Sequence, residues 1–209
     1  MLPSGSFVAL LVFATISSIT PGPNNLMLMA SGTNFGMART VPHALGVTIG
    51  FCAMTMVIGT GLVRLFEMFP VAYLALKVGC VCFLLYLAWK IAIAAPISST
   101  SAAGLATAKP FSFTQAALFQ WVNPKGWTMA LVAVTAYVPR SEPRLGLLVV
   151  VLVFGAVNLP CTVLWTLMGV KLRNLLNNSK ALRAFNISMA LLLVASLYWV
   201  VVGEGASLS

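Results

Sequence analysis

Two short polar stretches interrupt apolar runs of the chain and carry the side chains best suited to bind a ligand. The first is residues 21–25 (PGPNN), and the second is residues 123–125 (NPK). Amide and ammonium groups of this kind bind carboxylates and other polar ligands. Proline lacks a backbone N–H and clashes with the preceding helical turn, so a helix does not pass through it unbroken. We therefore expect each stretch to be a helix break that presents polar groups.

The first break has the composition of a helix start. Pro23 suits the first helical position, where its missing N–H costs nothing. A helix beginning there directs unpaired N–H groups and a partial positive charge at the break, which favours a bound carboxylate. The alternative is a plain proline kink, in which the asparagines bond the backbone carbonyls freed between Ser18 and Thr20. The candidate substrate-binding residues at this break are Pro21, Gly22, Pro23, Asn24 and Asn25.

The second break repeats this chemistry and adds a charge. Asn123 is a favoured N-cap residue, and Pro124 is the favoured first residue of a helix. Lys125 follows directly, and in a bilayer its ammonium group costs about 3 kcal/mol. It therefore needs a partner, which could be a substrate carboxylate, helix-terminal carbonyls or water; the alternative is that its stem reaches to the membrane surface. Gln120 lies close enough upstream to join the same candidate site.

Other polar residues in apolar segments carry weaker signals. Asn158 and Pro160 indicate a helix kink or a cavity lining, and we include Asn158 among the candidate binding residues. His43, the single histidine, is better suited to capping a helix or packing at an interface than to proton transfer. The cysteines lie in apolar runs without a C-x-x-C pair and are expected to be small buried residues; they are Cys52, Cys80, Cys82 and Cys161.

The composition places these breaks in a membrane. Of the 209 residues, 60% are apolar and only 7% are charged, with a mean hydropathy of +1.01, whereas about a quarter of a soluble domain is charged. The acids are Glu67, Glu142 and Glu204, so the net charge of +9 reflects a scarcity of acid and argues against nucleic-acid binding. One histidine and no aspartate argue against a metal site, and no G-x-S-x-G or similar catalytic motif indicates an enzyme.

The apolar pattern predicts an all-α integral membrane protein with six transmembrane helices, of which the first and the fourth are broken. Each segment is long enough for a bilayer about 30 Å thick. The first apolar segment lacks a positive n-region and a cleavage site, so we expect a retained helix rather than a signal peptide. A Ser-, Ala- and Gly-rich stretch over residues 94–110 reads as a flexible cytoplasmic linker. The segments are residues 7–30, 41–63, 71–93, 114–138, 145–170 and 184–202.

The loop charges predict an inverted repeat within a single domain, residues 1–209. The odd connections carry only basic charges, and the even side carries all three glutamates, so the odd connections should be cytoplasmic and both termini periplasmic. Three helices per half then give two inverted halves, residues 1–93 and 111–202. The breaks at Pro23 and Pro124 occupy corresponding positions in the two halves, as in transporters whose interrupted helices form a central site.

Five stretches resemble the RhtB branch of the lysine-exporter (LysE) family. They are residues 20–36 (TPGPNNL with SG and G downstream), 43–50 (HxxGxxxG), 86–90 (YLAWK), 109–125 (KPFSF with QxVNPK) and 165–169 (WxxxG). The resemblance spans nearly the whole chain, and within the branch the sequence is similar to exporters of cysteine and O-acetylserine and of threonine and homoserine. On matching positions, the PGPN and NPK residues carry over as the family's motif residues.

The resemblance implies efflux of a small amino acid across a bacterial inner membrane, driven by the proton motive force and without a cofactor. The chain lacks an intramembrane carboxylate, the usual proton carrier in coupled transport. The alternative is a membrane thiol-redox carrier of a related six-helix class, which places a cysteine beside each proline break; here those positions hold Asn24 and Asn123. We expect the protein to be surrounded by membrane lipid. The sequence does not identify the exported amino acid or the oligomeric state, and a homodimer is one possibility.

Overall fold

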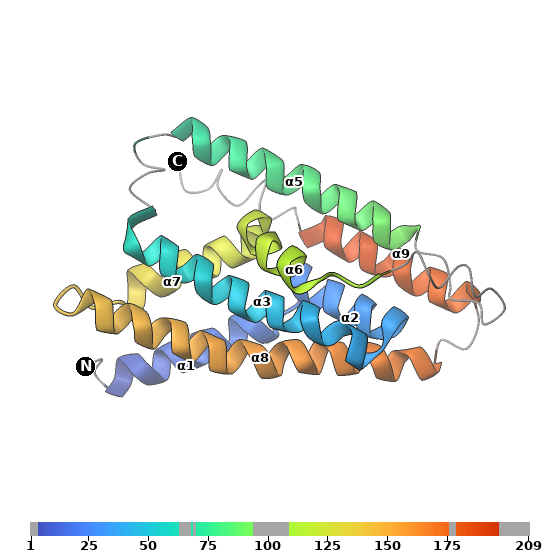
Figure 1. Cartoon of the computed structure of the whole chain (residues 1–209), viewed down its shortest axis with the longest axis horizontal. Helices are drawn as coiled ribbons and strands as arrows, with labels where there is room; N and C mark the ends of the chain where they lie inside the picture. The colour runs from blue at the N-terminus through green and yellow to red at the C-terminus, as the bar shows by residue number, and fades with distance from the viewer. Residues whose placement is uncertain (1–3, 63–67, 69, 94–108, 176–178, 197–209) are drawn as a thin grey trace.

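The computed structural model describes residues 4–62, 68, 70–93, 109–175 and 179–196; most of these residues are helical, and no strand occurs among them. The prediction of an all-α protein is therefore confirmed for this part of the chain (Figure 1). The α-helices are α1 (Ser4–Ile19), α2 (Pro23–Phe35), α3 (Met37–Val57), α5 (Pro70–Ala92), α6 (Phe113–Phe119), α7 (Pro124–Tyr137), α8 (Pro143–Leu175) and α9 (Ser179–Ser196). A π-helical turn, η1 (Ile58–Leu62), extends α3, and a 3₁₀ turn, η3 (Gln120–Val122), follows α6.

Both predicted breaks are present. The first apolar segment stops at Ile19 and restarts at Pro23, and α1 and α2 meet at an angle of 51°. The fourth segment divides into α6, η3 and α7, with Pro124 at the start of α7. Near Asn158 and Pro160, where the sequence indicated a helix kink or a cavity lining, α8 continues as one helix through Pro160. Proline removes one backbone hydrogen bond from a helix. The long apolar helix α8 continues despite that loss, whereas the helices end at the two breaks.

Length and composition mark membrane-crossing helices among the described residues. Met37–Gly61 and Pro143–Arg173 are each long and apolar enough to cross a membrane, and the bent pair formed by α1 and α2 qualifies as a third, broken span. Within α5, the residues Val81–Ala92 form a shorter apolar helical stretch. The structure therefore supports a membrane protein with a broken first span.

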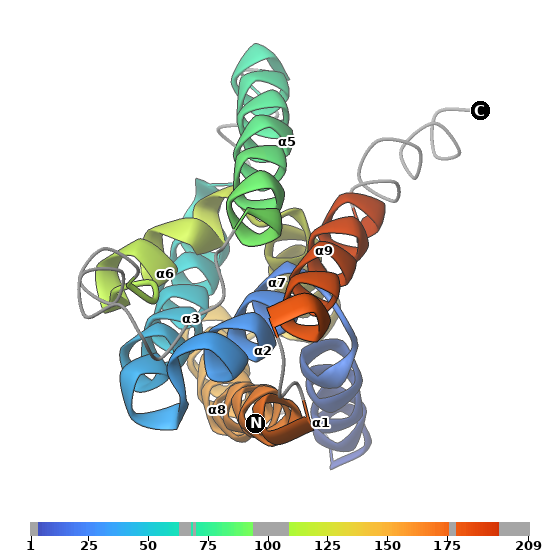
Figure 2. The ribbon, with the colours of Figure 1, turned by 90° about the vertical axis from the view of Figure 1, so that its right-hand side faces the viewer.

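The helices build two hydrophobic cores that meet along α3. One core lies among α2, α5, α6 and α9, and α3 contributes Ala44 and Val47 to it. The other lies among α1, α7 and α8, and α3 contributes Phe51 and Met54. Figures 1 and 2 show α5 on one side, packed along α9, and α8 on the opposite side beside α1. The proline breaks lie between the two cores.

Helix α2 lies unusually close to α8. A Cβ added at Gly32 would overlap the backbone carbonyl of Thr166, and one added at Gly169 would overlap the backbone carbonyl of Met29. The Thr33 hydroxyl donates to the carbonyl of Gly169 across the same contact, over 2.9 Å. Small residues thus let the two backbones touch, as is common between membrane helices.

Candidate functional site

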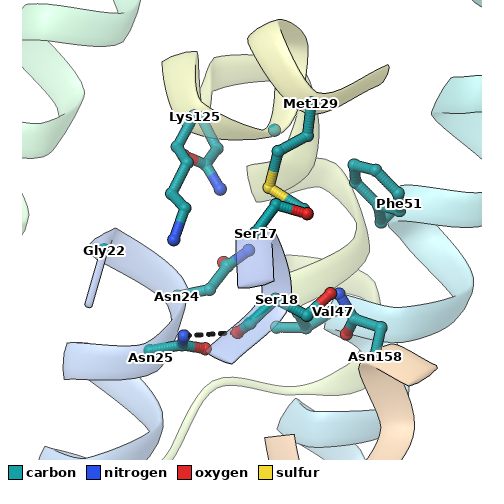
Figure 3. Close-up of a pocket in the computed structure, with 12 residues that line it drawn as sticks. Ser17, Ser18, Gly22, Asn24, Asn25, Val47, Phe51, Lys125, Met129 and Asn158 are labelled. Atoms are coloured by element: carbon teal, nitrogen blue, oxygen red, sulfur yellow. Dashed lines mark hydrogen bonds between the residues drawn. The ribbon is translucent and has the colours of Figure 1, made fainter. Parts of the chain in front are cut away.

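A small polar pocket lies where the two helix breaks face each other between the two cores (Figure 3). Six of the ten predicted binding residues line it. The lining residues are Ser17, Ser18, Gly22, Asn24, Asn25, Val47, Phe51, Asn123, Lys125, Gly126, Met129 and Asn158.

The carbonyls at the end of α1 are freed by the proline break, and side chains satisfy them. Asn25 donates to the carbonyls of Ser18 and Thr20, each over 2.8 Å, as the proline-kink alternative predicts. The Trp165 indole N–H donates to the carbonyl of Ile19 over 3.1 Å. The hydroxyl of Thr20 donates to the carbonyl of Ser17 over 3.1 Å. Asn25 and Trp165 therefore stabilise the break itself, because buried carbonyls without partners are costly.

Lys125 reaches from α7 across to the first break. Its Nζ lies 2.7 Å from the carbonyl oxygen of Thr20, 2.9 Å from the Thr20 hydroxyl and 3.4 Å from the carbonyl oxygen of Pro21. Figure 3 shows the side chain extending from α7 towards Gly22. Of the partners that the sequence allows, the structure selects helix-terminal carbonyls. Hydrogen bonds to a charged group contribute about 1.5–3 kcal/mol each, enough to offset the cost of an ammonium group in the membrane.

A second contact joins the breaks through two amide side chains. The Asn24 Nδ2 donates to Gln120 Oε1 over 2.8 Å, and the Gln120 Nε2 donates back to Asn24 Oδ1 over 3.2 Å. Gln120 is fully buried and also donates to the carbonyl of Ala116. Gln120 thus contacts the lining residue Asn24, although Gln120 itself is not among the lining residues. The pair fixes the amide of Asn24 at the edge of the pocket.

Two buried polar atoms of the pocket lining have no hydrogen-bond partner within the described part of the chain. They are the hydroxyl oxygen of Ser18 and the Oδ1 of Asn123. Asn123 is the N-cap residue of α7, as predicted, but its side chain makes no capping hydrogen bond. A buried polar atom without a partner is rare in proteins. These atoms are therefore available to a bound polar molecule.

Asn158 lies on the pocket wall opposite the breaks. Its Oδ1 accepts a hydrogen bond from the hydroxyl of Thr48 over 3.2 Å, which ties α8 to α3. Asn158, which lies within one turn of Pro160, therefore lines the pocket and also packs α8 against α3.

The remaining predicted residues shape the backbone around the pocket. Pro23 and Pro124 are the first residues of α2 and α7, and Pro21 contributes its carbonyl oxygen near Lys125. Gly22 has extended backbone angles that any residue can adopt (φ −176°, ψ 176°). Its lack of a side chain matters because an added Cβ would lie 2.6 Å from Cδ of Lys125.

Sequence reasoning missed several residues of the lining. Ser17 and Ser18 lie at the end of α1, and the apolar wall is formed by Val47 and Phe51 from α3 and Met129 from α7. Apolar residues in an apolar helix carry no sequence signal for a cavity. The two serines precede the break and could have been found by counting the polar residues of its last turn.

The histidine and the three cysteines whose side chains the structure describes lie outside this pocket. His43 is buried beside the ring of Phe111, with ring centroids 5.4 Å apart, and neither ring nitrogen has a partner among the described residues. It packs at an interface and caps nothing there. Cys161 is buried, Cys52 is half-buried and Cys82 is exposed, and none of these three lines the pocket. The placement of the Cys80 side chain lies outside the described residues.

The chain is similar to known proteins over most of its length. Proteins named cysteine/O-acetylserine efflux protein, from Escherichia coli (strain K12) and from Shigella sonnei (strain Ss046), are each 29% identical over 183 residues. In both cases the match covers 87% of this chain and 90% of the relative. No solved structure matches the chain. The family model described as LysE type translocator matches residues 15–198 and includes both breaks. The chain therefore belongs to the LysE type translocator family.

Proposed function

We propose that this protein exports an amino acid or a close derivative across the bacterial inner membrane. One observation carries the proposal: a positive charge, polar amides and two unpaired buried polar atoms line one pocket at the meeting point of two broken helices. The family and the names of the relatives, which describe efflux of cysteine and O-acetylserine, support the same class of substrate. Small polar amino acids of this kind are the substrates we expect.

The substrate's carboxylate binds between the starts of α2 and α7. Each of these helices begins at a proline and directs its unpaired N–H groups at the break, and helix N-termini favour anions. Lys125 supplies the counter-charge. The Ser18 hydroxyl and the Asn123 Oδ1 provide partners for further polar groups of the substrate, because both line the pocket and lack partners within the described residues.

The six predicted helices work as two inverted halves. Residues 1–93 and 111–202 each contain one broken helix, and alternating access results when one half rocks against the other around the central pocket. The observed joints at Pro23 and Pro124 support this arrangement. The family resemblance favours secondary transport driven by the proton motive force. The coupling group is then something other than an aspartate or glutamate of the pocket.

An export assay with Lys125→Ala tests the function and the site together. Cells that overproduce the protein should resist toxic amino acids and their analogues, and a panel of these identifies the substrate. We expect Lys125→Ala to reduce export at least about tenfold, because one hydrogen bond to a charged group contributes about 1.5–3 kcal/mol. The amount of protein in the membrane, measured in parallel, separates lost transport from lost insertion.

Lys171→Ala is the matched control, because Lys171 is an exposed lysine of α8 outside the pocket. It should export at the wild-type rate. Wild-type export by Lys125→Ala would show that Lys125 has no role in substrate binding. A complete absence of resistance or export for every amino acid of the panel would contradict the proposed function.

A further inference from the structure

Three oxygen atoms at the end of α1 surround the ammonium group of Lys125. They are the carbonyl oxygens of Thr20 and Pro21 and the hydroxyl oxygen of Thr20, at 2.7, 3.4 and 2.9 Å from Nζ. We call these three atoms the oxygen cage. An ammonium group has three N–H donors and no acceptor. The cage thus matches the hydrogen-bonding capacity of a primary ammonium group.

The oxygen cage is held in place by contacts that do not involve Lys125. The backbone N–H of Thr20 donates to the carbonyl of Ile16 over 3.1 Å, which keeps Thr20 on the end of α1. The Thr20 hydroxyl donates its own hydrogen to Ser17, so only its lone pairs remain for a ligand. Asn25 binds the Thr20 carbonyl from the other side. The helix end adds a partial negative charge, which favours a cation.

Lys125 reaches the cage from a different half of the chain and past a glycine. Its Nζ lies 3.1 Å, and its Cδ 2.6 Å, from the position that a Cβ of Gly22 would occupy. Both Gly22 and Lys125 line the pocket. The ammonium group that fills the cage is therefore beside the space in which a substrate would bind.

We propose that the oxygen cage is the receptor for the substrate's α-ammonium group and that Lys125 occupies it as a placeholder while the pocket is empty. When the zwitterion binds, its ammonium group enters the cage and Lys125 moves onto its carboxylate. This inference rests on the proposed function and specifies its recognition chemistry. It explains how a pocket without an acidic side chain binds a zwitterion, since oxygen dipoles hold the cation and Lys125 holds the anion.

The exchange gives every charged group a hydrogen-bond partner in both states. In the empty protein, the lysine ammonium is bonded to the cage; in the loaded protein, the substrate ammonium replaces it and the lysine pairs with the carboxylate. Neither step leaves an unpaired charge in the membrane, where it would be costly. The cage also accepts only a free amine, because an N-acylated amino acid lacks the three donors and the charge.

Chemical rescue tests the cage without any transport. Lys125→Ala removes three carbons and the ammonium group, so propylammonium matches the deleted fragment. We expect propylammonium chloride to raise the thermal midpoint of purified Lys125→Ala in detergent by about 2–4 °C in a saturable manner. Sodium chloride at the same concentration and 1-propanol should have no such effect. Adding Thr20→Val, which removes the cage hydroxyl, should weaken the rescue.

Wild-type protein and Lys171→Ala are the controls, since their cages stay filled by Lys125. Equal responses of Lys125→Ala and Lys171→Ala to propylammonium would overturn the proposal that the oxygen cage binds an ammonium group. A second measurement needs no variant: an amino acid that stabilises the wild-type protein must lose that effect when its amine is acetylated. Equal stabilisation by the N-acetyl derivative would also overturn the proposal. If no amino acid stabilises the wild type while propylammonium still rescues Lys125→Ala, the cage stands and the proposed function fails.

Discussion

The polar side chains at the two breaks divide into those that hold the backbone and those that face the pocket. Asn25 and Trp165 satisfy freed carbonyls at the end of α1. Asn24 pairs with Gln120 across the two breaks. Lys125 and Asn123 differ, because the first has a long mobile stem and the second leaves its Oδ1 unpaired. Residues with an exchangeable or missing partner are the ones suited to bind a substrate.

Gly22→Ala tests whether the side chain of Lys125 needs the space left beside Gly22 to reach Thr20. The new Cβ would press on Cδ of Lys125, which is flexible, so we expect the ammonium group to be displaced while the helices stay packed. Loss of one charged hydrogen bond predicts an export rate about 10- to 100-fold lower. The export assay measures this, and thermal unfolding should show a small change. Gly5→Ala on α1 is the control, since nothing lies within 4 Å of its added Cβ; wild-type export by Gly22→Ala would contradict the model of a tight passage.

Helix α2 is the element that connects the site to the rest of the protein. Its first residue is Pro23 at the pocket, and its backbone touches α8 at Gly32 and at Gly169. Helix α3 touches α6 in the same manner, because added Cβ atoms at Gly46 and Gly50 would meet the α6 backbone. These glycine contacts set the distance between helices and so fix where the two breaks meet.

Gly169→Ala should destabilise the protein by disturbing the packing of α8 against α2. Its Cβ would overlap the backbone carbonyl of Met29, which cannot move aside as a side chain can. Overpacking of this kind costs about 1–3 kcal/mol, equivalent to a fall of roughly 2–10 °C in the thermal midpoint. Gly79→Ala on α5 is the comparison, since its Cβ would meet nothing within 4 Å and alanine favours a helix. Equal midpoints for the two variants would show that α2 and α8 can separate freely.

The whole molecule consists of two cores with a polar pocket at their junction. Val47 belongs to one core and Phe51 to the other, and both line the pocket. The ties between the breaks, Lys125 to Thr20 and Asn24 to Gln120, join residues about a hundred positions apart in the chain. Contacts between distant parts of the chain therefore hold the pocket together at the junction of the two cores.

Reporter fusions test the predicted orientation of the whole chain. The charge asymmetry of the loops predicts that both termini lie in the periplasm and the 94–110 linker in the cytoplasm. Alkaline phosphatase should therefore be active, and a fluorescent protein dark, when fused after residue 209. The same reporters fused within the linker should give the reverse pattern and serve as the internal comparison. A fluorescent C-terminal fusion would overturn the six-helix arrangement with inverted halves.

The sequence by itself determined the class of protein and the positions of its breaks. The scarcity of charge indicated a membrane protein, and Pro21, Pro23 and Pro124 indicated helix ends, because proline cannot complete the backbone hydrogen bonds of a helix. These are local or compositional effects, so one sequence contains them. The alternatives for Lys125 and Asn25 could not be separated in the same way, because a side chain's partner depends on which segments fold beside it.

Only the tertiary structure decided how the two breaks meet. It brought Thr20 within 2.7 Å of Lys125, left the Ser18 hydroxyl and Asn123 Oδ1 without partners in the described residues, and added Phe51 and Met129 as the apolar wall. It also kept α8 continuous through Pro160. Each outcome depends on long-range packing at close-approach glycines such as Gly32 and Gly169, whose contacts are set by the other helix and not by neighbours in the chain.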